Sequence, residues 1–281
     1  SHIDWHRPDY YPWGRTGRNT GRTPSGTWED YLKFMDAQLT ELLTNYGPIG
    51  GIWFDGWWDK PDADWQLERQ YTLIHRLQPG CLIGNNHHKA PFEGEDFQMF
   101  ERDLPGQNKA GYSADAEISA LPLESCETMN NTWGYNINDR NFKSTKQLIH
   151  TLVGAAGNNA NLLLNVGPRP GGDFPEGSVT HLKEIGEWMR TYGETIQGTR
   201  AGTIPHQDWG VTTQKGNKLY VHILNLNKDQ LLLPITNKKV KTIVHFKDKT
   251  PVKYTKTKEG ILLQLGSVPT DIDHVIEITY R

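Results

Sequence analysis

The chain has 281 residues, 30 Lys and Arg against 33 Asp and Glu, a net charge of −3 and a pI near 6.4. It is longer than a usual single domain of roughly 100–200 residues. The sequence has no excess of basic residues that would predict a nucleic-acid partner, and no run of charges that would predict binding to a membrane surface. No apolar run approaches the roughly 18 residues of a membrane-spanning helix. Cys81 and Cys126 lack a metal-binding spacing, so we expect free thiols.

Strand and helix signals alternate through the first two-thirds of the chain. Residues 1–6 have strand-like content, and residues 7–26 have the Arg, Gly, Pro and Thr content of a long loop. Ser25 or Thr27 caps the first helix, in which apolar residues recur at helical spacing. The expected elements are helix 28–46, strand 49–55, helix 63–78, strands 81–84, 96–101 and 122–127, helix 145–156, strand 161–168 and helix 176–192.

This order predicts βα units and a parallel sheet, that is, an α/β fold. Polar or acidic residues end four of the strands, as in (β/α)8 TIM barrels. A complete barrel takes roughly 250 residues, but only four or five strand–helix units are visible before the pattern changes. We therefore expect residues 1–200 to be the C-terminal portion of a catalytic barrel that is incomplete at its N-terminus.

After about residue 200, short strands follow one another without helices between them. The expected strands are 218–224, 231–235, 240–245, 260–265 and 274–280. Short strands separated by turn residues are typical of an antiparallel β-sandwich. We therefore predict a second domain, a β-sandwich, over residues 201–281.

The segment Gly-Ile-Trp-Phe-Asp-Gly-Trp-Trp, residues 51–58, is the most informative part of the chain. A short apolar run there ends at Asp55, among three tryptophans, as a buried strand does when it enters a loop. Indole faces pack against sugar rings, and an aspartate beside them can act as a nucleophile or acid in glycosidic-bond cleavage. The alternative is an aspartate that caps the next helix, with the tryptophans in the core.

Two strand-end carboxylates, Asp55 and Glu101, form the best candidate pair. Two-step glycoside hydrolysis needs one ionised carboxylate to attack the anomeric carbon and one protonated carboxyl to release the leaving group. The second group needs a raised pKa. Spacing alone does not exclude the competing acids, which are Glu95, Asp96, Glu124 and Glu127.

At these residues the chain resembles the bacterial type of the α-L-fucosidases of glycoside hydrolase family 29. The matching segments occur in family order and are residues 3–11, 51–56, 96–106, 126–135 and 161–168. The resemblance implies a catalytic barrel followed by a β-sandwich. It also implies a retaining exo-α-L-fucosidase that forms a covalent fucosyl-enzyme intermediate on terminal α-L-fucosyl residues.

The resemblance implies a role for each matching residue. Asp55 matches the nucleophile, and Glu101 matches the acid/base of bacterial members. Glu124 aligns with the acid proposed for animal-type members and stays the alternative. Trp53 is expected near the sugar, and Trp133 is either a sugar platform or part of the core.

The chain departs from the family pattern in two places. Some members carry an arginine near Asn86 and His87, and this chain has none there. His87 or His88 is the expected substitute, against the alternative of a hydrogen-bonding role within the loop. The family's early sugar-binding residues lie upstream of Ser1, so we expect the 281 residues alone to have little fucosidase activity.

The resemblance implies no cofactor and no metal, and a fucosylated oligosaccharide or glycoconjugate as the substrate. Neither a nucleic acid nor a membrane is an expected partner. A periplasmic or secreted location follows from the resemblance, although the sequence carries no signal peptide. The alternatives are a catalytically impaired fucose-binding protein and a glycosidase for a related sugar.

Overall fold

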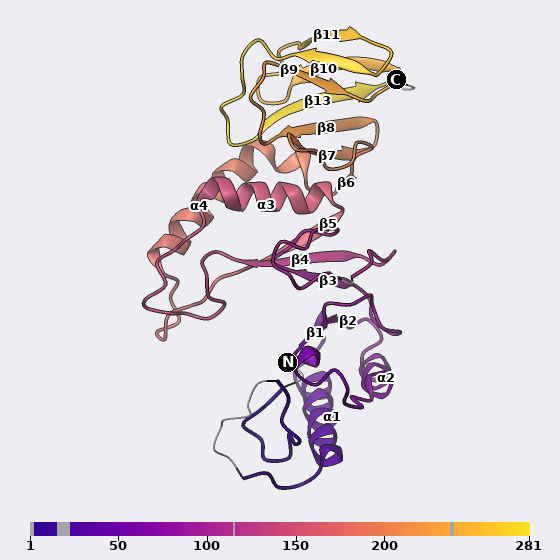
Figure 1. The fold of residues 1–281 in the computed structure, drawn as a ribbon, viewed down its shortest axis with the longest axis vertical. Coiled ribbons are helices and arrows are strands. Elements are labelled where there is room, and N and C mark those ends of the chain that lie inside the picture. Colours follow the sequence, from indigo (N-terminus) through magenta and orange to yellow (C-terminus); the bar gives the residue numbers. More distant parts are fainter. Residues whose placement is uncertain (1–2, 16–22, 115, 237–238) are drawn as a thin grey trace. The chain divides into compact units, whose positions relative to one another are not determined.

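The computed structural model describes residues 3–15, 23–114, 116–236 and 239–281. The chain divides into two compact units, Ser1–Glu124 and Ser125–Arg281, and Figure 1 labels their elements. In the described part of the chain, no helix combines the length and apolar character that a membrane span requires.

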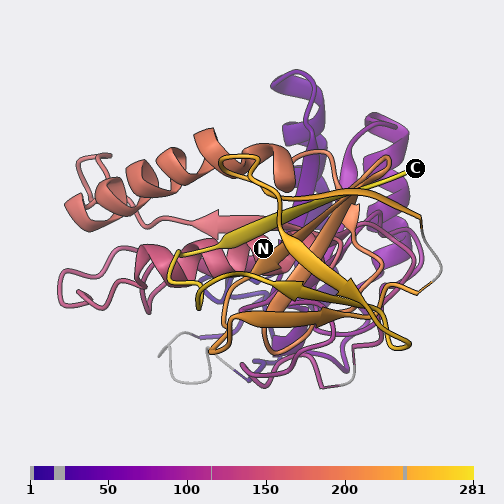
Figure 2. The same ribbon diagram turned by 90° about the horizontal axis from the view of Figure 1, so that it is seen from above.

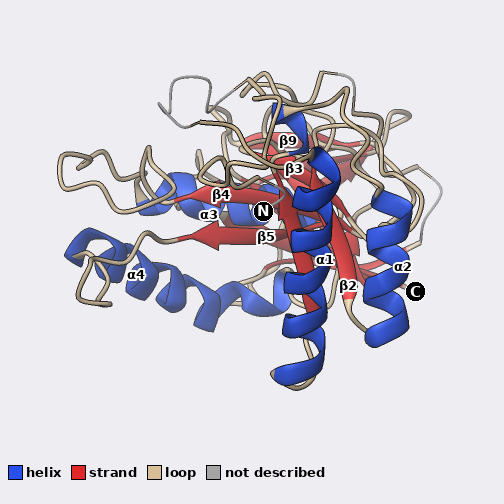
Figure 3. Cartoon of the chain, turned by 90° about the horizontal axis from the view of Figure 1, so that it is seen from below, coloured by secondary structure: helices blue, strands red, loops and turns tan. Residues whose placement is uncertain are grey.

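The first unit contains a two-stranded parallel sheet beside two helices (Figure 3). Strand β1 pairs with β2 so that Gly51 lies opposite Leu82 and Asp55 lies opposite Asn86. The pairing is parallel, so both strands end at the same edge of the sheet. The elements are α1 (Trp28–Asn45), β1 (Gly51–Asp55), the 3-10 helix η1 (Trp57–Asp59), α2 (Leu67–Leu77), β2 (Leu82–Asn86) and β3 (Gln98–Glu101).

Helix α1 begins where the sequence predicts, after Thr27. The Thr27 hydroxyl accepts a hydrogen bond from Asp30 N, and the Asp30 carboxylate accepts one from Thr27 N, which together form a capping box. The buried face repeats at helical spacing and comprises Tyr31, Leu32, Met35, Leu39 and Leu43. This face packs in one core with α2, β1 and β2.

Two expectations for the first unit are wrong in detail. Helix α2 begins at Leu67 rather than residue 63, because Gln66 has a left-handed backbone (φ 51°) and bonds through its N–H to the Asp64 carboxylate. Residues 3–6 form a turn rather than a strand, with Arg7 N donating to Asp4 O at 3.0 Å. Residues 1 and 2 of that expected strand lie outside the described residues.

The second unit starts within β4 (Leu123–Thr128), which lies beside β5 (Ala160–Asn165). Two helices, α3 (Thr145–Gly157) and α4 (Glu176–Tyr192), pack through an apolar cluster that includes Ile149, Val153 and Trp188. Helix α3 has a Ser144–Gln147 capping box, which fixes its start. These elements confirm the predicted strand and helix signals over residues 122–192.

Two antiparallel sheets form the rest of the second unit, and Figure 2 looks onto their orange and yellow strands. The five-stranded sheet has the order β10–β13–β8–β7–β6, and the three-stranded sheet has the order β11–β12–β9. The strands are β6 (Arg200–Ala201), β7 (Gly210–Lys215), β8 (Lys218–Ile223), β9 (Gln230–Leu233), β10 (Val240–His245), β11 (Lys253–Lys256), β12 (Ile261–Gln264) and β13 (His274–Tyr280).

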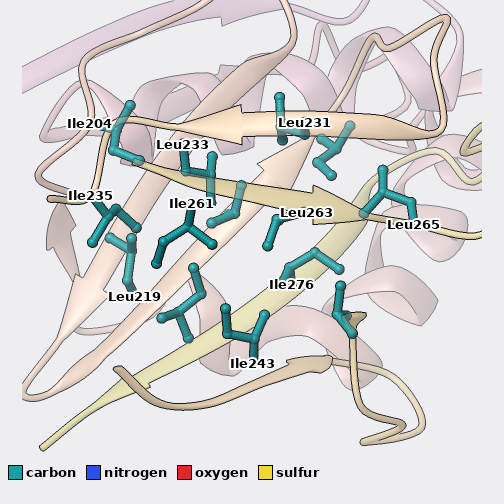
Figure 4. Packing of buried hydrophobic residues seen from close by; sticks show 14 of the residues in the cluster. Ile204, Leu219, Leu231, Leu233, Ile235, Ile243, Ile261, Leu263, Leu265 and Ile276 are labelled. Carbon is teal, nitrogen blue, oxygen red and sulfur yellow. The ribbon is translucent and has the colours of Figure 1, made fainter. Parts of the chain in front are cut away.

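The two sheets share one apolar core (Figure 4). Leu219 and Ile276 from the larger sheet and Leu233 and Leu263 from the smaller sheet are fully buried in it. Burial of each such side chain stabilises the fold by about 1.5–3 kcal/mol. All five strands predicted after residue 200 are present, and their antiparallel arrangement is confirmed.

The sequence analysis missed strands β6, β7 and β11, each of which reads as polar. In β7, Thr212 and Thr213 are fully buried, and their hydroxyls donate to Ile204 O and Thr195 O. Strand β11 is exposed at every residue on the edge of its sheet. Hydrophobic periodicity therefore could not reveal either strand. The closed barrel and the domain boundary at residue 200 stay predictions.

Gly14 is a packing constraint in the first unit. A methyl group at Gly14 would overlap the carboxylate of buried Asp59. The backbone oxygen of Asp59 also accepts a hydrogen bond from Arg15 N at 2.9 Å. We therefore predict that Gly14→Ala lowers the free energy of unfolding by about 1–3 kcal/mol. Chemical denaturation measures this, with Gly50→Ala as the control, because a methyl group at Gly50 meets nothing within 4 Å. An equal loss in both variants would contradict the prediction.

Candidate functional site

The candidate site lies at the edge of the first unit's sheet where β1 and β2 end. Asp55 is the last residue of β1, and its partner in the parallel register is Asn86, the last residue of β2. Gly56 then turns the chain with a left-handed backbone (φ 102°), a conformation that favours glycine. Helix η1 follows at once and returns an indole to the strand end.

The Asp55 carboxylate accepts hydrogen bonds from two side chains. Trp58 Nε1 donates to Asp55 Oδ1 at 3.0 Å, and Asn86 Nδ2 donates to the same oxygen at 3.3 Å. Both donors are neutral, so they orient the carboxylate without adding a positive charge. The two hydrogen bonds fix the orientation of the carboxylate at the strand end.

The same Asn86 amide joins Asp55 to Glu101. Asn86 Nδ2 donates to Glu101 Oε2 at 2.8 Å, so both carboxylate oxygens lie within 3.3 Å of one nitrogen. This allows the separation of roughly 5–5.5 Å between carboxyl groups that retaining glycosidases need. The expected pairing of Asp55 and Glu101 at one site is therefore present, although β2 lies between their strands.

His88 is the second partner of Glu101. His88 Nε2 lies 3.1 Å from Glu101 Oε2, and its ring stacks on Tyr112 with the centroids 5.1 Å apart and the planes at 15°. The stack holds the imidazole against the carboxylate. That His88 substitutes for the family's arginine stays a prediction.

The alternative acid, Glu124, is tied to the same strand as Asp55. Trp53 Nε1 donates to Glu124 Oε1 at 2.8 Å. Trp53 precedes Asp55 by two residues in β1, so the two side chains leave the same face of the strand. The structure thus joins all three candidate carboxylates to one strand end through Trp53, Trp58 and Asn86.

The pKa values of the two glutamates shift in opposite directions. Burial alone would raise the pKa of Glu101, but hydrogen bonds from His88 and Asn86, with the charges of His88 and Arg102, hold it below its usual value. Burial raises the pKa of Glu124, and the hydrogen bond from Trp53 only partly offsets it. Relative to an ordinary glutamate, the surroundings of Glu101 shift it toward the ionised form, and those of Glu124 shift it toward the protonated form.

His87 and Trp133 are the two other predicted site residues. His87 is buried, and its Nε2 lies 3.0 Å from Glu95 Oε1, which also accepts a bond from Tyr71. This network supports the hydrogen-bonding alternative for His87. Trp133 belongs to the second unit, where its backbone oxygen accepts a bond from Asn165 Nδ2 at 2.7 Å. A sugar contact of Trp133 stays a prediction.

The sequence analysis missed Asn86 as a site residue, and it did not foresee that Trp58 would donate to Asp55. Like Asp55, Asn86 is a polar residue at the end of a buried strand. Its amide is uncharged, however, so the sequence alone does not mark it as a catalytic candidate. Asn86 is 2% exposed, and its Oδ1 has no hydrogen-bond partner within the described residues. A buried acceptor without a partner is costly, and a bound hydroxyl group would satisfy it.

The opposite pKa shifts predict opposite effects of Glu→Gln on stability. The lowered pKa of Glu101 contributes stability above its ordinary pKa of 4.5, and this is lost as the pH falls through the folded value. The raised pKa of Glu124 contributes stability below 4.5, and this is lost as the pH rises through the folded value. At about pH 7, Glu101→Gln should therefore destabilise the protein, and Glu124→Gln should not.

Urea denaturation of both variants at about pH 7 and about pH 4 measures this difference. Each variant serves as the control for the other, because the substitution is the same. The glutamine oxygen at position 124 can still accept the Trp53 hydrogen bond. Equal changes in the free energy of unfolding at about pH 7 would contradict the two shifts.

Comparison with known proteins agrees with this fold. The fold is mixed α/β with an antiparallel sandwich, and the site is a pair of strand-end carboxylates. The family model described as alpha-L-fucosidase matches residues 1–194. The chain belongs to the α-L-fucosidase family, glycoside hydrolase family 29.

Relatives support this assignment over most of the chain. An α-L-fucosidase of Dictyostelium discoideum is 26% identical over 282 residues, which is 95% of this chain and 58% of that protein. The structure of α-L-fucosidase isoenzyme 1 from Paenibacillus thiaminolyticus has a TM-score of 0.80 and 34% identity, and the match covers 100% of this chain and 70% of that one.

A family 29 α-L-fucosidase from Bacteroides thetaiotaomicron has a TM-score of 0.74 and 25% identity, over 90% of this chain and 61% of that chain. The chain spans a little over half of the length of the Dictyostelium discoideum α-L-fucosidase that it matches.

Proposed function

We propose that this chain carries the catalytic carboxylates of a retaining exo-α-L-fucosidase that removes terminal α-L-fucosyl residues from fucosylated glycans. The observation that carries the proposal is the Asn86 amide, which joins Asp55 to Glu101 at one strand end. In a family 29 enzyme from Bacteroides thetaiotaomicron, a covalent intermediate was trapped with 2-fluoro-fucosyl fluoride. A periplasmic or secreted location is part of the proposal.

Asp55 is the proposed nucleophile. One carboxylate oxygen attacks the anomeric carbon and forms a glycosyl ester, while the bond to the leaving oxygen breaks. Trp58 and Asn86 hold the carboxylate in place before the attack, and both are neutral donors. Asn86 Oδ1 is then free to accept a hydrogen bond from a sugar hydroxyl group.

The acid/base role has two candidates that different observations favour. The geometry favours Glu101, because it shares Asn86 with Asp55. The pKa directions favour Glu124 as the proton donor of the first step, because burial raises its pKa. The lowered pKa of Glu101 suits the second step, in which an ionised carboxylate takes a proton from water. We propose Glu101 for the role, with Glu124 as the alternative.

The nucleophile is tested by Asp55→Asn in the full-length natural protein. The amide keeps the shape and can still accept the Trp58 hydrogen bond, but it cannot form the ester. We expect turnover of an aryl α-L-fucoside to fall by at least about 10³-fold, with little change in the melting temperature. The control is Asp208→Asn, which makes the same change at an exposed position of the second unit. Turnover within a few-fold of the unmodified protein would reject Asp55.

The acid/base assignment is tested with leaving groups of different basicity. In Glu101→Ala, aryl fucosides with acidic phenols should lose less rate in the first step than those with basic phenols, because they need little protonation. Azide should restore the breakdown of the intermediate and yield fucosyl azide. Glu124→Ala is the matched variant, and finding both effects only there would transfer the role to Glu124.

The class of sugar is tested with a panel of aryl glycosides on the unmodified protein. Hydrolysis of the α-L-fucoside in preference to other deoxy or galacto-configured sugars supports the proposal. Preference for another sugar would replace fucose as the substrate. Binding of fucose with no hydrolysis of any glycoside would favour an impaired binding protein.

A further inference from the structure

Apart from the candidate site, a pocket lies on the loop that follows strand β1, which ends at Asp55. Its volume is about 540 Å³, within the range of roughly 300–1,000 Å³ for small-molecule sites. Asp59, which ends helix η1, is part of its wall, and Trp58 of the same helix donates to Asp55. Other lining residues are Trp13, Arg15, Trp28, Lys60 and Asp62.

The walls of this pocket are fixed to each other by hydrogen bonds. Arg15 N donates to Asp59 O at 2.9 Å, and Tyr10 Oη donates to Asp59 Oδ2 at 2.7 Å. Gly14 lies so close to the Asp59 carboxylate that no side chain fits between them. The 12–15 and 59–63 segments therefore hold one arrangement, as a preformed binding site requires.

The two tryptophans of the pocket differ in what covers their rings. Trp28 stacks on Tyr31 with the centroids 5.2 Å apart, and Lys60 Nζ lies 3.6 Å from the centre of the Trp28 ring. Trp13 meets Tyr11 edge to face at 6.0 Å, packs in part against the core and, like Trp28, is only partly buried. Trp13 is thus the indole that can offer a face to a ligand.

The charges around the pocket balance. Arg15 and Asp62 are exposed and of opposite sign, and buried Lys60 and Asp59 also have opposite signs. Burial lowers the pKa of Lys60 to about 8, so its amine stays mostly protonated at about pH 7 and its charge faces that of Asp59. A balanced lining with one free indole face favours a neutral, hydroxyl-rich ring over an anionic ligand, because sugar C–H faces pack on indole and sugar hydroxyls bond to charged groups.

We propose that this pocket, with Trp13 as its platform and Arg15 and Asp62 as its hydrogen-bonding groups, binds a neutral pyranose of the glycan from which the sugar is released. The proposal rests on the proposed function for the identity of the substrate, and on the pocket alone for binding. Because helix η1 touches both Asp55 and the pocket, the reacting bond and the following sugar lie along one loop.

The test measures binding separately from catalysis. The 281-residue chain is titrated with N-acetyllactosamine, which lacks fucose, while the indole N–H signals are followed by NMR. We expect the Trp13 signal to shift and Trp13→Ala to weaken binding by at least about tenfold. Arg15→Ala, at an exposed side chain, should weaken binding without changing the fold. The control Tyr46→Ala removes an exposed aromatic ring outside the pocket and should leave binding unchanged.

Two results would overturn the proposal. One is a titration that leaves the Trp13 signal unmoved, or binding that survives both Trp13→Ala and Arg15→Ala. The other is tighter binding of sialyllactose, which would assign the pocket to an acidic glycan.

Hydrolysis in the full-length protein separates this proposal from the proposed function. Trp13→Ala should raise KM for fucosylated N-acetyllactosamine much more than it changes hydrolysis of α-L-fucosyl fluoride, which has no second ring to pack on Trp13. Failure to cleave the aryl fucoside rejects the fucosidase, whereas N-acetyllactosamine binding still decides the role of the pocket.

Discussion

The bridge made by the Asn86 amide is the interaction on which the site depends. Two carboxylates at short range repel each other, and the repulsion raises the cost of ionising both. A neutral N–H donor between them lowers that cost. The bridge exists because β1 and β2 are parallel and in a register that ends them together. A shift of one residue would turn the side chains to the other face of the sheet.

The three carboxylates of the site lie in three different environments. Asp55 accepts bonds from an indole and an amide, Glu101 contacts an amide and an imidazole, and half-buried Glu124 accepts a bond from an indole. Acid–base chemistry at one pH requires groups whose proton affinities are pushed apart by their surroundings. Here the imidazole of His88 and the burial of Glu124 produce that separation.

Much of the fold could be predicted from sequence because its elements carry strong local signals. The Thr27 capping box and the apolar run that ends at Asp55 are examples, and both lie where the sequence places them. Strand β7 could not be predicted in this way, because buried threonines with bonded hydroxyls look like surface residues in a sequence. The bounds of α2 depended on the backbone of Gln66, which has no sequence signature.

The site was predictable only in part, for a related reason. A charged residue that ends an apolar run is visible in a sequence, so Asp55 and Glu101 could both be predicted to lie at strand ends. The roles of His87 and His88 depend on which way adjacent side chains point. His87 turns into the buried network of Glu95, and His88 turns to Glu101. The sequence of two adjacent histidines does not say which side chain points to which carboxylate, because the backbone conformation of the loop determines those directions.

The stack of His88 on Tyr112 couples a loop to the protonation of the site. Tyr112 is 45% exposed and lies in the segment between β3 and β4, and the ring beneath it supports Glu101. A bound glycan that displaced Tyr112 would release His88 from the carboxylate and raise the pKa of Glu101. Glu101 would then hold a proton more readily when a substrate is bound, and it would serve better as a proton donor in the occupied site.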